Sequence, residues 1–88
     1  MTIIETLLGW LCTPSQVGYE YPSNETIHQA ITLARKFPEY TRVVPDANGG
    51  IVLSRKYDIR EEEVHVWNAN SVELIQYECG RIVLRQSL

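Results

Sequence analysis

The sequence of 88 residues has the length of one small domain, which we place at residues 1–88. Apolar residues make up 44% and charged residues 22%, proportions that are typical of a folded globular chain and argue against intrinsic disorder. The formal net charge of −3 predicts no binding to nucleic acid or to an anionic membrane surface, because both need a basic face.

Two segments near the start of the chain have the spacing of amphipathic helices. The first begins at Thr2, with Glu5 three positions later in the arrangement of a capping box. The second begins after Ser23, a residue type that favours the N-cap position, and ends before Pro38. Residues 15–22 are predicted to connect the two helices, because a glycine and a proline interrupt the pattern there.

From Thr41 onward the apolar residues recur at every second position, which is typical of β-strands. A short edge strand is predicted over residues 41–44, and four longer strands over residues 51–57, 62–68, 72–79 and 81–86. Strands joined by such short connections form antiparallel hairpins. The predicted fold class is therefore α+β, with two N-terminal helices packed on one face of an antiparallel four- to five-stranded β-meander.

The stretch PDANGG before the second predicted strand has two interpretations. Glycines that cradle a phosphate stand between a strand and a helix, where backbone N–H groups and the helix dipole converge on the anion. Here Gly49 and Gly50 are followed by the β-branched run Ile51–Val52, and no Gly-Lys-Ser/Thr ending is present. The sequence therefore predicts a turn whose glycines supply positive φ angles.

Alternation along the strands divides the sheet into two faces. The residues predicted to point toward the helices are Ile51, Leu53, Val64, Val66, Leu74, Ile82 and Leu84. The opposite face is either an ordinary solvated surface or a contact surface, because aromatic and arginine side chains are enriched at protein interfaces. The residues proposed for that contact are Trp67, Ile75, Tyr77, Val83 and Arg85.

Two histidines are candidates for chemistry. His28 is predicted to be an exposed residue of the second helix without a catalytic role. His65 is more interesting, because a histidine beside a carboxylate can act as a general acid or base and Glu61–Glu63 lie close by in sequence. A lone histidine in a strand is usually only packed or solvated, and the glutamates are expected to form a solvated hairpin shoulder. We therefore predict no catalytic residue.

Metal and nucleophile chemistry has little support in the sequence. Cys12 and Cys79, together with the two histidines, show no ligand pair at zinc-site spacing, so neither a metal nor a cofactor is expected. Cys79 as a nucleophile would need a base and an activating field, neither of which the sequence shows. The N-terminus lacks the features of a secretory signal, which predicts reduced thiols in a cytoplasmic protein.

The basic residues Lys56, Arg81 and Arg85 are candidates for a nucleic-acid or acidic-ligand surface. Glu73 is predicted to lie among them, and the chain as a whole is acidic. The expected partners therefore include no nucleic acid and no membrane.

The segment from Pro45 to Leu53 resembles one in a family of small uncharacterised bacterial proteins. In that family a P-x-A-D-G-G-I-x-L-E-W-like segment leads into a β-meander, whereas Ser54-Arg55 stand here where the pattern has an acid and a tryptophan. The resemblance implies the fold and carries no activity.

These observations favour a small non-enzymatic module that binds a protein partner or associates with itself as a homodimer. The alternative is a small-molecule-binding protein or small enzyme that uses His65 with a neighbouring carboxylate.

Overall fold

A computed structural model describes residues 2–12, 22–46 and 48–88. The elements in chain order are α1 (Ile3–Cys12), α2 (Asn24–Lys36), β1 (Arg42–Pro45), β2 (Ile51–Tyr57), β3 (Arg60–Asn68), β4 (Ser71–Glu78) and β5 (Arg81–Ser87). The predicted α+β class with two N-terminal helices is confirmed. The predicted connector over residues 15–22 lies outside the described residues, apart from its last residue.

Both helices begin at the caps that the sequence predicts. The Thr2 hydroxyl accepts a hydrogen bond from the Glu5 amide and donates one to the Glu5 carboxylate, each at 3.1 Å. The Ser23 hydroxyl accepts from the Thr26 amide at 3.2 Å and satisfies one of the unpaired donors at the start of α2. Helix α2 ends two residues before Pro38, which cannot continue it.

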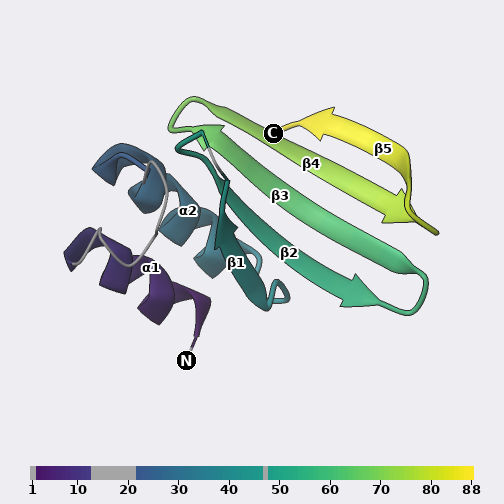
Figure 1. The fold of residues 1–88 in the computed structure, drawn as a ribbon, viewed down its shortest axis with the longest axis horizontal. Helices are drawn as coiled ribbons and strands as arrows, with labels where there is room; N and C mark the ends of the chain where they lie inside the picture. Colours follow the sequence, from purple (N-terminus) through teal and green to yellow (C-terminus); the bar gives the residue numbers. More distant parts are fainter. Residues whose placement is uncertain (1, 13–21, 47) are drawn as a thin grey trace.

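The five strands form one antiparallel sheet in the order β1-β2-β3-β4-β5 (Figure 1). Each strand pairs with its neighbour in sequence, as the short connections predict. In the centre of the sheet Leu53 lies opposite Val64, which lies opposite Leu74, and this row faces the helices. The register therefore places the apolar side chains of three strands on one face.

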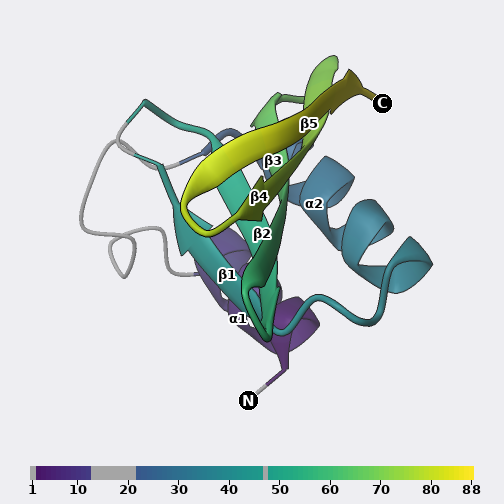
Figure 2. The same cartoon turned by 90° about the vertical axis from the view of Figure 1, so that its right-hand side faces the viewer.

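The core lies between the helices and this face of the sheet. Figure 2 shows the sheet nearly edge-on with α2 on one side of it. The buried residues that form the core are Leu7, Trp10, Ile27, Ala30, Ile31, Leu33, Ala34, Tyr40, Ile51, Leu53, Val64, Val66 and Val72. Every helix-facing residue predicted in β2 and β3 belongs to this core.

The sheet extends beyond the helices on that same face. In Figure 1 the β2–β3 and β4–β5 turns lie at the end of the sheet that is remote from α1 and α2. Glu62 lies on the helix-facing side of β3 and is only 7% exposed, so the expectation of a solvated glutamate is wrong. Its carboxylate accepts hydrogen bonds from Tyr40 Oη at 2.9 Å, Gln76 Nε2 at 2.6 Å and Arg55 Nε at 3.1 Å. Polar groups therefore continue the packing where the apolar core ends.

Strand β5 departs from the predicted alternation because of a register shift. Ile82 lies opposite Tyr77, but Leu84 lies opposite Gln76, so Val83 is the extra residue of a β-bulge. The bulge reverses the expected side of Ile82, which shares the face of Tyr77 and is exposed rather than packed on the helices.

The same bulge separates the two arginines of β5. Arg85 lies opposite Ile75, on the face away from the helices, as predicted. Arg81 lies opposite Glu78, which has the helix-facing parity of β4, so its predicted side is wrong.

Candidate functional site

Asp46 and residues 48–50 of the PDANGG stretch lie between β1 and β2, with the Asp46 carboxylate at the centre of a turn. The Asp46 amide donates to the Gly50 carbonyl at 3.0 Å. Asp46 Oδ1 accepts from the amides of Asn48 at 2.7 Å and Gly50 at 2.8 Å, as aspartate does in turns. Gly49 has the positive φ of 84° that the sequence predicts, whereas Gly50 permits a close approach: a Cβ there would collide with Asp46 Oδ2.

The turn directs Asp46 onto the sheet face that lies away from the helices. His65 Nε2 donates to Asp46 Oδ2 at 2.8 Å, and the two side chains are only 13% and 16% exposed. Burial alone would raise the pKa of Asp46, but the hydrogen bond from His65 and those from the two turn amides outweigh burial and lower this pKa. Asp46 is therefore a fixed carboxylate that orients the imidazole.

His65 in turn supports Trp67 two residues later on the same face. The two rings are stacked with centroids 3.6 Å apart and planes 13° from parallel. The indole Nε1 donates to Glu73 Oε1 at 2.8 Å, so both the plane and the edge of the indole are fixed. Trp67 remains 38% exposed. The result is a tryptophan that is rigidly held and still accessible.

Glu73 links this tryptophan to the last strand. Arg85 donates from Nε to Glu73 Oε2 at 2.8 Å and from a second nitrogen to Oε1 at 3.2 Å, a bidentate pair between β4 and β5. These hydrogen bonds, followed by the one from Trp67, lower the pKa of Glu73. We call the continuous chain of Asp46, His65, Trp67, Glu73 and Arg85 the face network.

A second carboxylate on this face has the opposite electrostatic environment. Burial and the neighbouring charge of Glu61 raise the pKa of Glu63. Tyr77 is half-buried and donates to Glu63 Oε2 at 3.4 Å. Burial and the charge of Glu63 raise the pKa of Tyr77, so the phenol stays protonated and remains a donor.

The residues proposed for a contact surface differ in accessibility. Trp67, Val83 and Arg85 are exposed, Val83 to 57%, and Tyr77 is half-buried. Ile75 lies on the predicted face between Glu63 and Arg85 but is only 4% exposed, so its assignment to direct contact is wrong.

His65 meets a carboxylate from an unexpected part of the chain. The sequence suggested a partner among the glutamates of β3, but the partner is Asp46, which is 19 residues away. Among the described residues no serine, threonine or cysteine is hydrogen-bonded to the imidazole. His28 is exposed on α2, as predicted.

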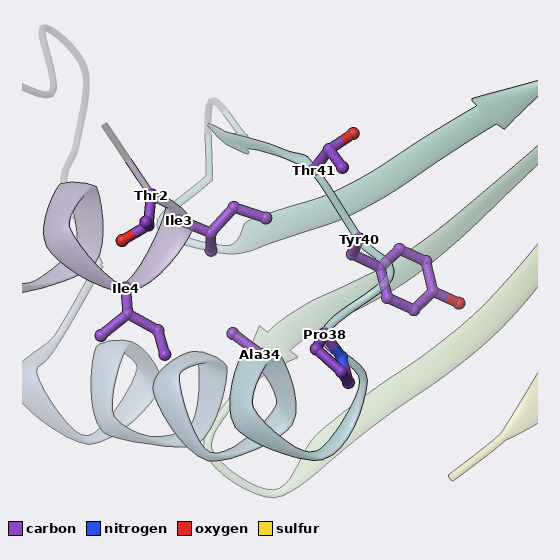
Figure 3. Close-up of a pocket in the computed structure, with 7 residues that line it drawn as sticks. All are labelled: Thr2, Ile3, Ile4, Ala34, Pro38, Tyr40 and Thr41. Carbon is purple, nitrogen blue, oxygen red and sulfur yellow. The ribbon is translucent and has the colours of Figure 1, made fainter.

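A separate cavity of about 410 Å³ lies on the helix side of the sheet. Figure 3 shows Ile3 and Ile4 of α1 and Ala34 of α2 around it, with the ring of Tyr40 at one end and its hydroxyl directed away. The Tyr40 hydroxyl is bonded to Glu62 instead. The cavity is bordered mainly by apolar side chains and does not include His65, so the two features do not form one catalytic site.

Metal ligands are not gathered in the part of the chain that the structure describes: no three Cys, His, Asp or Glu side chains there are placed to hold an ion. Cys12 and Cys79 are both exposed and unbonded to one another. Neither described helix combines the length and apolar character needed to cross a bilayer.

Sequence reasoning missed Asp46 and Glu73 as members of the site. Aspartate in a glycine-rich turn signals local capping of amides, but nothing in the spacing shows that its second oxygen reaches β3. Glu73 could have been found from the register, since His65 lies directly opposite it.

Comparison with known proteins gives no relative: the chain matches no protein-family model, no curated protein and no solved structure. The resemblance of Pro45 to Leu53 to small bacterial proteins therefore stays a prediction.

Proposed function

We propose that this chain is a non-enzymatic interaction module that binds a protein partner through the sheet face around Trp67. The observation that carries the proposal is the face network, which holds an exposed tryptophan by a stacked imidazole and a carboxylate. Tryptophan, tyrosine and arginine are the residues most enriched among those that dominate binding energy. Because the indole is already ordered, little side-chain entropy is lost on binding.

The partner is either another protein or a second copy of the chain, and the sheet face serves both alternatives. Trp67, Tyr77, Val83 and Arg85 give a mixed aromatic, aliphatic and cationic surface of the composition found in interfaces. A cytoplasmic location stays a prediction of the sequence.

The test compares two truncations of exposed apolar side chains. Trp67→Ala should weaken binding of a purified partner by about thirty-fold or more, the effect of removing a central anchor. Ile59→Ala is the matched control, because Ile59 is 54% exposed but lies in the β2–β3 turn. Equal affinity of the wild-type protein and Trp67→Ala would refute the proposal. Light scattering distinguishes self-association from a different partner.

The second candidate function is small-molecule binding or acid–base catalysis at His65, which the 2.8 Å contact with Asp46 favours. A functional pair should make the titration of His65 depend strongly on its carboxylate and on added ligand. Proton NMR titration of the imidazole in the wild-type protein and in Asp46→Asn measures this dependence. Identical titration curves in the two proteins would exclude a coupled acid–base pair.

A further inference from the structure

The two edges of the sheet differ in how they are protected. Strand β1 is four residues long and ends in Pro45, which has no backbone N–H to offer a further strand. Strand β5 is seven residues long, contains no proline, and every one of its residues is exposed. In Figure 1 it forms the outer edge of the sheet on the side away from the helices. An edge of this length is a template for another strand.

The side chains of β5 add an apolar surface to this free backbone edge. Ile82, Val83 and Leu84 are consecutive, and they are 52%, 57% and 38% exposed. Strand β4 is the only element that contacts β5 in the part of the chain that the structure describes. Three neighbouring apolar side chains on an unpaired edge bury their surface when a strand is added.

The charges of β5 indicate the kind of strand that fits. Arg81 and Arg85 flank the apolar tripeptide, and β5 contains no carboxylate, although the whole chain carries a charge of −3. Arg81 makes no ion pair within the described ranges. Arg85 uses two of its nitrogens for Glu73 and keeps further N–H donors. A partner strand with two carboxylates three positions apart would place one opposite each arginine, as Glu78 and Ile75 are placed in β4.

A second copy of the chain fits this edge poorly. If two β5 strands pair antiparallel, two arginines from each copy come to the shared edge and neither strand supplies a carboxylate to balance them. Like charges gathered on a strand pair destabilise it. The other edge of a second copy offers only Arg42, two valines and a proline. Neither edge of the chain is complementary to β5.

We infer that β5 binds an extended segment of a different protein, with apolar residues between flanking carboxylates, as a sixth strand of the sheet. Main-chain hydrogen bonds supply the affinity of such strand addition, and the side chains supply the specificity. The inference rests on the proposed function because both make the chain an interaction module. It concerns the edge of β5 rather than the face around Trp67, so different variants test the two.

The experiment uses the full chain and a synthetic peptide as long as β5, made of valine and threonine with two glutamates three positions apart. This is the separation of Glu78 and Ile75, which lie opposite Arg81 and Arg85 in β4. Chemical-shift mapping and amide exchange on the ¹⁵N-labelled protein should show changes concentrated in β5. A peptide with lysines in place of the glutamates should bind about tenfold more weakly, because two favourable charge pairs become unfavourable. The glutamate peptide N-methylated at alternate amides should lose binding, since it cannot complete the ladder.

Two matched protein variants test the role of charge at the edge. Arg81→Gln should lower the preference for the glutamate peptide by about threefold, the size of one cross-strand charge pair. Arg42→Gln removes an exposed arginine from the opposite edge and should leave the preference unchanged. Circular dichroism checks that both variants are folded, and Ile59→Ala, in the β2–β3 turn, should bind the peptide like the wild-type protein.

Several outcomes would overturn the inference. These are the absence of binding, equal affinity for the two charged peptides, and shifts concentrated in β1 or at the Trp67 indole. Protected β5 amides in a dimer of the free protein would show that a second copy occupies the edge. If the peptide binds at β5 while Trp67→Ala leaves a natural partner bound, the edge inference stands and the proposed face does not.

Discussion

Replacing Glu62 tests whether the buried carboxylate stabilises the fold. Glu62→Ala leaves the Tyr40 hydroxyl, whose residue is 6% exposed, without its acceptor at 2.9 Å. An unsatisfied buried donor costs about 1–3 kcal/mol. Arg55 is 32% exposed and can turn to water, so the loss of its interactions and those of Gln76 adds only about 1 kcal/mol. The variant should therefore unfold more easily by about 2–4 kcal/mol.

Urea denaturation followed by circular dichroism measures this difference, with an unchanged m-value confirming that the unfolded state is comparable. Glu61→Ala is the matched control, since Glu61 points to the other face and should change stability by less than about 0.5 kcal/mol. The double variant Tyr40→Phe/Glu62→Ala should show coupling of about 1–2 kcal/mol. Equal stabilities of Glu62→Ala and Glu61→Ala would refute the assigned role.

The same carboxylate gives a pH dependence with a definite sign. Burial alone would raise the pKa of Glu62, but hydrogen bonds from Tyr40 and Gln76 and the charge of Arg55 outweigh burial and lower it below the ordinary value of 4.5. Its stabilisation is therefore present above pH 4.5 and is lost as the pH falls through the lower folded-state value. Glu62→Ala should consequently lose less stability in acid than the wild-type protein does.

Three further substitutions test the face away from the helices and the turn before β2. Because the pKa of Glu63 is raised by burial and by Glu61, Glu63→Gln should stabilise the fold at pH 7 by about 0.5 kcal/mol, the size of a like-charge pair on one sheet face. Denaturation at pH 4 should show the difference disappearing, and a constant difference would contradict the electrostatic explanation. In the turn, Gly49→Ala places a side chain at positive φ in open space and should cost about 1 kcal/mol. Gly50→Ala should lower the free energy of unfolding by about 1–3 kcal/mol, because the added Cβ displaces the Asp46 side chain. Gly50→Ala, unlike Gly49→Ala, should therefore shift the NMR resonances of His65, and unshifted resonances would contradict this explanation.

The fold could be predicted because its determinants are local in sequence. The predicted change of apolar period from helical spacing to alternation falls at Thr41, and β1 begins one residue later, at Arg42. Thr2 and Ser23 mark the two helix starts, and Pro38 marks the end of the second. Short connections leave each strand only its sequence neighbour to pair with, so the meander follows without knowledge of distant contacts.

The exact side of each β5 residue could not be predicted, since one unpaired residue reverses the alternation beyond it. The strand reads as a regular run, and only its pairing with β4 shows that Val83 is the extra residue. The burial of Glu62 was equally hidden, because three consecutive glutamates are normally solvated. Its donors come from Tyr40, 22 residues earlier, and Gln76, 14 residues later, which no local pattern relates to it.

Contact across long sequence separations also explains why the site was only partly visible. Trp67, Tyr77 and Arg85 were found from residue type and alternation. The groups that fix Trp67 were not, because Asp46 reaches His65 only through a turn whose shape depends on several backbone hydrogen bonds. Such positions are determined by tertiary structure rather than by propensity.

The unequal lengths of helices and strands account for the surfaces that the sheet leaves open. Helix α1 has 10 residues and α2 has 13, lengths of about 15 and 20 Å, whereas the nine residues of β3 span about 30 Å. Two such helices cannot cover every strand along its whole length. On the helix side the uncovered part of the sheet carries Glu62 and the side chains hydrogen-bonded to it, and the other side carries the face network.

The side chains of Ile82, Val83 and Leu84 in β5 remain exposed. The bulge twists this edge and the two arginines give it positive charge, and both features limit the association of identical chains. They leave its backbone open to a strand of opposite charge. If β5 bound no strand, the exchange rates of its amides would be the same with and without either peptide. Amide exchange that becomes slower only in β5, and only when the glutamate peptide is added, would show that the edge binds a strand.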